Sequence, residues 1–168
     1  MTAGAVVWLT GLPASGKSTL AGHLVDRLRG RGREPILLDG DEVRAALVPT
    51  PGYDPVGRDG FYRSLGNLAG LLAGQGAVVV VAATAHRRVW RDAARARAPH
   101  FVEVHVATAA DECARRDPKR LYARPDARAD LPGAGTAYEP PLAPEVVAAG
   151  GDDAAALEAV LARIAELG

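Results

Sequence analysis

Residues 11–19 read GLPASGKST, where two glycines bracket four residues and precede a lysine and two hydroxyl side chains. Glycine allows backbone conformations in which several N–H groups point at one centre, an arrangement that suits a phosphate group. A lysine can bridge the outer phosphates and a hydroxyl can bind Mg²⁺, so the pattern predicts a nucleoside triphosphate site. The expected nucleotide-binding residues are Gly11, Ala14, Ser15, Gly16, Lys17, Ser18 and Thr19, with Ser18 as the Mg²⁺ ligand.

The stretch LLDGDEVR holds a second set of groups suited to chemistry. Its two carboxylates flank a glycine after an apolar run, and ligands of open α/β sheets bind at the carboxyl ends of strands. Asp39 can position Mg²⁺ or its waters, and Asp41 can accept a proton from an acceptor hydroxyl. Alternatively, Asp41 only caps a short helix over residues 42–47. With Lys17, these two carboxylates are the candidate catalytic residues.

The elements that must position these groups alternate along the chain between apolar runs and helical patterns. This alternation predicts an α/β fold with a parallel, about five-stranded sheet and helices on both faces. Strands are expected over 5–9, 35–39, 77–83 and 101–106, with a short fifth strand over 144–148. Helices are expected over 17–29, 59–73, 90–98 and 109–116, and after Asp152 and Asp153, which suit a helix N-terminus.

Two stretches interrupt the alternation within a single expected domain, residues 1–168. Residues 48–58 form a loop rich in proline and glycine, and residues 115–144 carry six prolines. A long irregular segment in a compact domain is typically a lid or binding loop, or else disordered. We expect a mobile lid over about 115–144, which would keep water from the transferring phosphoryl group.

Composition narrows the class of protein. Acidic and basic residues balance at 20 each, which argues against a general affinity for nucleic acid or an anionic membrane. Cys113 is the only cysteine, so no internal disulfide can form, and we expect a reducing cytoplasm. The apolar run Val78–Ala83 is too short to span a membrane, and no signal peptide is expected. The expected partner is an anionic small-molecule substrate, and we also consider a homodimer.

Other nucleotide-binding classes lack their signatures here. A GTPase needs a base-reading N-K-x-D motif, which the sequence does not contain. A motor ATPase has an apolar strand ending in a carboxylate, whereas the run VVVVAAT ends without one. The short chain and the long lid favour a small-molecule kinase that uses ATP.

At the level of motifs, the chain resembles the adenylylsulfate kinases, which phosphorylate the 3′-hydroxyl of adenosine 5′-phosphosulfate. GLPASGKST is similar to GLSGSGKST of that family, and LLDGDEVRAAL is similar to LLDGDNVRxGL. FVEVHVATAADECARRDPKRLY resembles F-[IV]-E-V-x-V-D-T-P-L-x-x-C-E-x-R-D-P-K-G-L-Y, and YEPP resembles Y-E-x-P. The resemblance extends over about residues 6–141 and implies a single-domain P-loop kinase with a mobile lid.

The resemblance also implies roles by position. ATP and Mg²⁺ would be the cofactors, Arg116 and Lys119 would lie over the phosphates, and Tyr53 would stack on the acceptor adenine. Arg44 and Arg58 would hold the phosphosulfate. The implied acceptor-binding residues are Asp39, Asp41, Arg44, Tyr53, Arg58, Phe61, Thr84, Lys119 and Leu131.

Departures from the family pattern cluster in the acceptor half. Phe61 replaces an asparagine, Leu131 replaces the phenylalanine of F-T-G, Ala85 replaces the serine of I-S-P, and Arg120 replaces the glycine of K-G-L-Y. Either the family reaction persists with compensated drift, or a related kinase acts on another acceptor, such as a specialised metabolite. A nucleotide-binding module without catalysis is disfavoured, because the catalytic carboxylates and lysine remain. His86, Arg87 and Arg88, after the third strand, either contact substrate or form the start of a solvated basic helix.

Overall fold

The computed structural model describes residues 3–123 and 130–168 of the chain. Five strands form one sheet in the order β2-β3-β1-β4-β5, and every neighbouring pair is parallel, which confirms the predicted α/β class. The strands are β1 (Ala5–Thr10), β2 (Ile36–Asp39), β3 (Val78–Ala82), β4 (Phe101–Val106) and β5 (Val146–Ala148).

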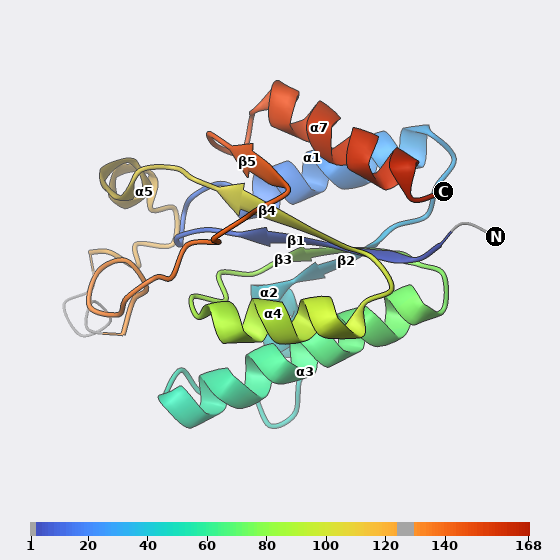
Figure 1. Cartoon of the computed structure of the whole chain (residues 1–168). Coiled ribbons are helices and arrows are strands. Elements are labelled where there is room, and N and C mark those ends of the chain that lie inside the picture. The colour runs from blue at the N-terminus through green and yellow to red at the C-terminus, as the bar shows by residue number, and fades with distance from the viewer. Residues whose placement is uncertain (1–2, 124–129) are drawn as a thin grey trace.

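Helices cover both faces of the sheet (Figure 1). On one face lie α1 (Lys17–Gly30) and α7 (Ala154–Glu166); on the other lie α3 (Pro55–Gly74) and α4 (Arg88–Arg97). Two short helices, α2 (Gly40–Ala46) and α5 (Ala110–Arg116), follow the carboxyl ends of β2 and β4. The segments that follow β1, β2, β3 and β4 therefore meet at one edge of the sheet.

The two central strands explain why the sheet is stable in this order. β1 (AVVWLT) and β3 (VVVVA) are buried along their whole length, as expected for β-branched residues between two helical layers. Their alternate side chains feed two separate cores, one under α1 and α7 and one under α3 and α4. The predicted stripe of Leu20, Leu24 and Leu28 lies in the first core, where each buried leucine contributes about 1.5–3 kcal/mol.

Three predicted helices begin at least two residues earlier in the structure, including α4, which begins at Arg88 instead of residue 90. The helix predicted from residue 59 begins at Pro55, because proline is well suited to the first turn of a helix, where its missing N–H has no partner. The short helix predicted over 42–47 begins at Gly40, with Asp39 at its N-cap. The loop predicted over 48–58 is accordingly shorter.

The connection between α5 and β5 contains the predicted lid. Residues 124–129 lie outside the described residues, and the described parts on either side consist of turns and extended chain. The Asp117 carboxylate accepts hydrogen bonds from the backbone N–H groups of Leu121 and Tyr122. The Tyr122 hydroxyl donates to the carbonyl of Pro13 at 2.9 Å, and burial raises the pKa of this phenol to about 12. The connection is therefore tied to the loop after β1.

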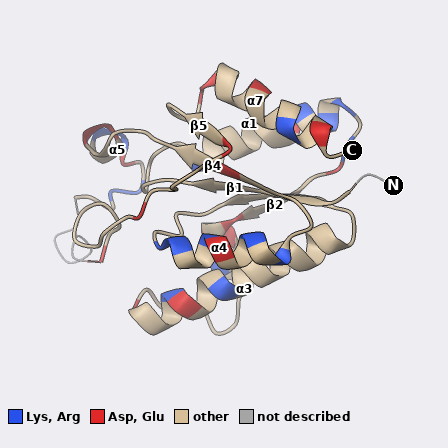
Figure 2. Cartoon of the chain, in the orientation of Figure 1, with Lys and Arg blue, Asp and Glu red and all other residues tan. Residues whose placement is uncertain are grey.

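Charged residues lie mainly on helices and loops, and β1 and β3 carry none (Figure 2). Glu103 on β4 is an exception within the sheet and is only 7% exposed. Cys113 is fully buried, with its thiol donating to the carbonyl of Thr108, in agreement with a structural role. Among the described helices, none combines the length and the apolar character that crossing a membrane requires.

Candidate active site

The loop between β1 and α1 has the backbone shape that its glycines predict. Gly16 has a φ of 100°, and a Cβ built there would lie 2.6 Å from the backbone nitrogen of Gly151. A Cβ on Gly11 would lie 2.5 Å from the carbonyl oxygen of Val106. Neither position can hold a side chain without displacing backbone, so the loop can wrap closely around a phosphate at the N-terminus of α1.

A third residue of this loop, an alanine, also has an unusual backbone conformation. Ala14 has a φ of 63°, in the left-handed region that favours glycine. The corresponding residue of the family pattern GLSGSGKST is a glycine, which explains the conformation. Next to it, the Ser15 hydroxyl is buried without a hydrogen-bond partner among the described residues, while the Ser15 carbonyl accepts from the Thr108 hydroxyl at 2.6 Å.

The side chain of Lys17 folds back onto the loop that precedes α1. Its ammonium donates to the carbonyls of Gly11 at 3.0 Å and Leu12 at 2.8 Å. Burial lowers the pKa of Lys17 to about 8, although the nearby carboxylates of Asp39 and Asp41 oppose the shift. The cation is thus held beside the phosphate-binding backbone by weak acceptors, which phosphate oxygens can replace.

Ser18 and Asp39 join the first predicted set of residues to the second. The Ser18 hydroxyl donates to Asp39 Oδ2 at 2.6 Å. The other oxygen, Oδ1, accepts from the backbone N–H of Asp41 at 3.0 Å and caps α2. The alternative in which Asp41 serves as the cap is therefore wrong, because the N-cap is Asp39, two residues earlier, at the end of β2. The carboxylate of Asp41 therefore does not cap the helix.

Asp41 projects from the first turn of α2 and forms an ion pair with Lys119. Both side chains are more than half exposed, at 63% and 61% respectively, so solvent can reach them. The hydrogen bond with Asp41 raises the pKa of Lys119. The structure thus brings together Lys17, Ser18, Asp39, Asp41 and Lys119, which the sequence had placed in two motifs and a lid.

Arg44 is buried between two aromatic rings. Its guanidinium carbon lies 4.3 Å from the ring centroid of Tyr53 and 4.0 Å from that of Phe61. Its Nη1 donates to the carbonyls of Pro51 and Gly52. Phe61 lies beneath the guanidinium and is 3% exposed, whereas Tyr53 is 59% exposed and keeps contact with solvent. A cation–π sandwich of this kind fixes the guanidinium plane.

The remaining acceptor-side residues lie around this sandwich. Arg58 on α3 donates through Nη2 to the carbonyl of Asp130 at 2.6 Å. Leu131, next in the chain, is 7% exposed. The carbonyl of Thr84, after β3, accepts from the Thr10 hydroxyl at 2.6 Å. Arg116, predicted over the nucleotide, forms an ion pair with Glu112 one turn earlier on α5.

Backbone strain marks two of the departures in the acceptor half. Arg120 has a φ of 53°, and it replaces the glycine of the K-G-L-Y pattern. Ala85 has a φ of 39° and is fully buried. A non-glycine residue in this region costs about 1 kcal/mol or more, so the surrounding contacts must hold both segments in place.

His86 is buried and does not belong to a solvated helix start, whereas the side chain of Arg87, the N-cap of α4, is exposed. The imidazole packs edge-on against Trp90, with ring centroids 5.0 Å apart, and its Nδ1 has no partner among the described residues. Burial, together with nearby arginines, lowers the pKa of His86 to about 4. The ring is therefore neutral at physiological pH.

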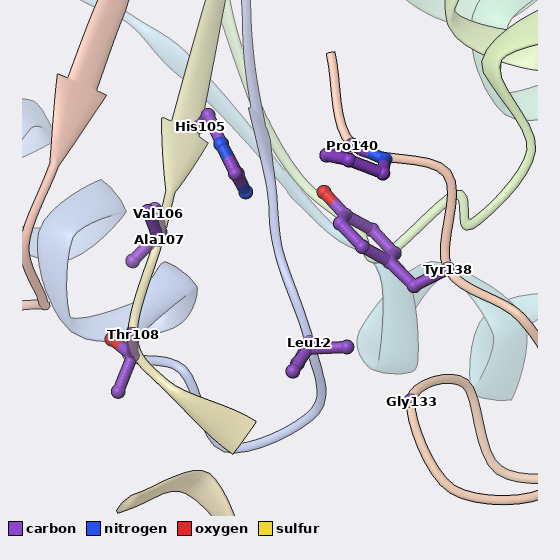
Figure 3. Close-up of a pocket in the computed structure, with 8 residues that line it drawn as sticks. All are labelled: Leu12, His105, Val106, Ala107, Thr108, Gly133, Tyr138 and Pro140. Carbon is purple, nitrogen blue, oxygen red and sulfur yellow. The ribbon is translucent and has the colours of Figure 1, made fainter.

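A cavity of about 340 Å³ lies beside the phosphate-binding loop (Figure 3). Its walls come from the end of β4, from Leu12 and from the chain that leads into β5. The residues that line it are Leu12, His105, Val106, Ala107, Thr108, Gly133, Tyr138 and Pro140. None of the predicted site residues lines this cavity, and sequence reasoning did not find it.

Comparison with known proteins places the geometry in context. The family model described as adenylylsulphate kinase matches residues 3–149. The adenylyl-sulfate kinase of Shewanella baltica is 43% identical over 145 residues, covering 84% of this chain and 71% of that protein. A protein described as probable bifunctional SAT/APS kinase 2, from Sorangium cellulosum, is 41% identical over 98% of this chain. The chain spans only 29% of the length of that bifunctional relative.

Among solved structures, the Mycobacterium tuberculosis APS kinase CysC in complex with AMPPNP and APS has a similar fold. The two chains share 31% identity with a TM-score of 0.84, and the match covers 99% of each. The likeness therefore extends over the whole chain and includes the edge of the sheet that carries the candidate site.

Proposed function

The chain belongs to the adenylylsulfate kinase family, and from this premise we propose that it transfers the γ-phosphate of ATP to the 3′-hydroxyl of adenosine 5′-phosphosulfate. The observation that carries the proposal is the junction of the two motifs, in which the Ser18 hydroxyl meets Asp39 at 2.6 Å. This contact places the phosphate-binding loop directly beside Asp41, so that donor and acceptor groups can meet at one point.

On the donor side, the backbone N–H groups of the loop and the ammonium of Lys17 bind the phosphates of ATP. Lys17 exchanges its two loop carbonyls for phosphate oxygens and stabilises the charge that develops on the leaving ADP. Ser18 and Asp39 would provide the oxygen ligands that Mg²⁺ prefers, and their 2.6 Å contact supports a shared position beside one ion. Mg²⁺ bound there would neutralise phosphate charge.

On the acceptor side, Asp41 accepts the proton of the 3′-hydroxyl as the oxygen attacks the γ-phosphorus. A P–O bond to the acceptor forms, the bond between the γ-phosphorus and the bridging oxygen breaks, and ADP leaves. The carboxylate of Asp41 lies at the surface next to Lys119, so an acceptor hydroxyl can reach it without rearrangement of α2.

Arginines and an aromatic ring bind the rest of the acceptor. Arg58 and Arg44 bind the phosphosulfate, since guanidinium groups suit planar arrays of oxyanion acceptors. Tyr53 already covers Arg44 with one face and remains 59% exposed, which leaves ring surface for an adenine. Together with Thr84 and Leu131, these residues form the acceptor half of the site.

A second candidate function is transfer to a different anionic acceptor. The observation that favours it is the burial of Phe61 beneath Arg44, where the family pattern has an asparagine that can donate hydrogen bonds. Kinetics of the variant Phe61→Asn/Leu131→Phe decide between the two. A gain in activity on adenosine 5′-phosphosulfate over a feeble wild type favours the second candidate. An efficient wild type with a poorer variant favours the first.

The compartment and the assembly also belong to the proposal. A reaction that consumes ATP, in a chain whose only cysteine is buried and reduced, fits the cytoplasm. A homodimer is proposed as the assembly, and sedimentation of the purified protein tests it.

The proposed function is tested by steady-state turnover of ATP with adenosine 5′-phosphosulfate, with adenosine 5′-monophosphate, and without acceptor. We expect turnover to depend on the first compound, because the arginines need the additional oxyanion. Equal turnover in all three reactions would overturn the proposal.

A further inference from the structure

Arg91 on α4 is almost completely buried, with 1% of its surface exposed, yet it belongs to neither motif of the site. The sequence around it, RRVWRDAARAR, is strongly charged and gives no sign that this arginine is buried. A buried guanidinium must be neutralised and hydrogen-bonded, because its desolvation costs several kcal/mol. Its partners therefore show what the residue does.

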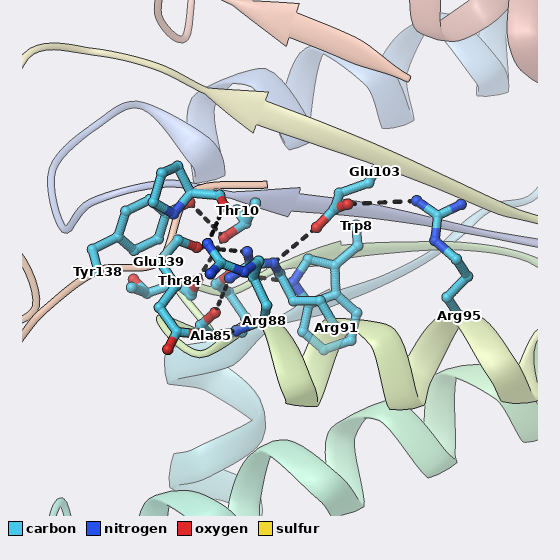
Figure 4. Close-up of polar contacts among 12 residues, drawn as sticks. Trp8, Thr10, Thr84, Ala85, Arg88, Arg91, Arg95, Glu103, Tyr138 and Glu139 are labelled. Atoms are coloured by element: carbon cyan, nitrogen blue, oxygen red, sulfur yellow. Dashed lines mark hydrogen bonds and ion pairs between the residues drawn. The ribbon is translucent and has the colours of Figure 1, made fainter. Parts of the chain in front are cut away.

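One partner neutralises the charge, and the other two come from separate loops (Figure 4). Nε donates to the Glu103 carboxylate on β4 at 2.8 Å. Nη1 donates to the carbonyl of Ala85, after β3, and Nη2 donates to the carbonyl of Glu139 at 2.6 Å. Arg91 thus fastens the segment after β3 to the chain that leads into β5.

We name these two segments the β3 loop (residues 84–86) and the strap (residues 138–140). Further contacts join them to each other. The backbone N–H of Glu139 donates to the carbonyl of His86 at 2.8 Å, and the Tyr138 hydroxyl lies 2.9 Å from the Thr10 hydroxyl. The Thr10 hydroxyl in turn donates to the carbonyl of Thr84. These contacts lie beside the guanidinium of Arg91, whose Cζ atom is 5.8 Å from the Tyr138 ring centroid.

Both fastened segments border the acceptor half of the site. Thr84 of the β3 loop is an expected acceptor-binding residue. The strap continues from the connection that carries Leu131, another expected acceptor-binding residue. By contrast, Arg91 contacts none of the phosphate-binding residues, so the donor half does not depend on it directly.

We propose that Arg91 is a positioning residue that sets the acceptor half of the site by fixing the β3 loop against the strap. The role rests on the planar guanidinium, whose three nitrogens are spread over a rigid plane and reach three separate acceptors. A lysine ammonium carries its three N–H groups on a single nitrogen and cannot span the same acceptors. The effect that we expect on the kinetics rests on the proposed kinase function.

The test compares Arg91→Lys with Arg95→Gln. Arg95 is a matched control, because it also forms an ion pair with Glu103, and a second one with Glu145. Among the described residues, no hydrogen bond or ion pair joins Arg95 to the β3 loop or to the strap. We expect Arg91→Lys to lower kcat/KM for adenosine 5′-phosphosulfate on the order of 10- to 100-fold, the range typical of a slight displacement of positioned groups. The KM for ATP should stay within about twofold of wild type.

Arg95→Gln should reduce the melting temperature without changing either kinetic constant by more than about twofold. Tyr138→Phe, which removes only the hydroxyl contact to Thr10, provides a milder variant in case Arg91→Lys folds poorly. It should lower acceptor kcat/KM in the same direction by a smaller factor. Equal losses for ATP and acceptor, or the same acceptor loss in Arg95→Gln, would overturn the inference.

Hydrogen exchange separates this inference from the proposed function. Peptides that contain the β3 loop and the strap should exchange faster in Arg91→Lys than in wild type, while the peptide that contains residues 11–19 should not change. If wild type does not phosphorylate adenosine 5′-phosphosulfate, the proposed function fails, and the exchange result still decides the role of Arg91. Unchanged exchange in both segments would overturn that role.

Discussion

The ammonium of Lys119 pairs with the carboxylate of Asp41, although the two residues lie 78 positions apart in the chain. Asp41 stands at the start of α2, and Lys119 lies in the connection between α5 and β5 that we expect to act as a lid. The candidate base is therefore engaged by a cation from that connection. Binding of phosphates and acceptor would draw Lys119 towards the new negative charge and leave Asp41 to the acceptor hydroxyl.

Asp41→Asn should separate catalysis from structure. Because Asp39 caps α2, the substitution should leave the melting temperature and the affinity for ATP nearly unchanged. Turnover should fall by roughly the 10²- to 10⁴-fold that loss of a general base typically causes. Single-turnover kinetics with saturating ATP measure the effect, and a wild-type rate would exclude Asp41 as the base.

Lys17 should take up a proton when a nucleotide binds. With its pKa lowered to about 8, about half of the Lys17 side chains are neutral at pH 8, and phosphate oxygens favour the ammonium form. Calorimetry of ADP binding in two buffers with different ionisation enthalpies should therefore show uptake of about half a proton at pH 8, and almost none at pH 6.5. Lys17→Met is the control, and identical uptake in this variant would contradict the assignment.

Arg58→Ala should affect the acceptor far more than the donor. Arg58 lies on α3, and its described hydrogen bond is to the carbonyl of Asp130. We expect the KM for the anionic acceptor to rise about tenfold or more, as for loss of one charge-assisted contact, with little change for ATP. A parallel rise in both constants would assign Arg58 to the donor or to the fold.

His86 should make the fold sensitive to acid. Its pKa is lowered from 6.5 in the unfolded chain to about 4 in the fold, so the unfolded state binds more protons between these values. Stability is therefore complete above pH 6.5 and declines as the pH falls towards 4, with a slope of at most about 1.4 kcal/mol per pH unit. Melting curves of His86→Phe should show a shallower decline, and His23→Gln, an exposed control, should not.

Much of the fold could be predicted because short stretches of the sequence show the pattern of a buried strand or of an amphipathic helix. The strands at 5–10 and 78–82 are continuous apolar runs, and periodic leucines mark α1. The start of α3 was missed because Pro55 and Gly57 resemble loop residues, and only the structure shows the proline in the first helical turn. Helix α2 was displaced by two residues, since either Asp39 or Asp41 could serve as its cap.

The donor half of the site follows from a contiguous motif, whereas the acceptor half depends on tertiary contacts. Burial of Arg44 between two rings and of Arg91 between two loops joins residues that are distant in sequence. Charged residues in a helix usually face solvent, so nothing in the sequence distinguishes Arg91 from its neighbours. Glu103, a carboxylate in the mainly apolar strand β4, is the signal that a buried cation lies nearby.

Direct identification of the reaction product tests the central claim most directly. Phosphorus NMR and mass spectrometry should show that the protein converts ATP and adenosine 5′-phosphosulfate into ADP and 3′-phosphoadenosine 5′-phosphosulfate in equal amounts, and that Lys17→Ala forms neither product. Consumption of ATP by the wild type without a phosphate on the 3′-oxygen would contradict the claim.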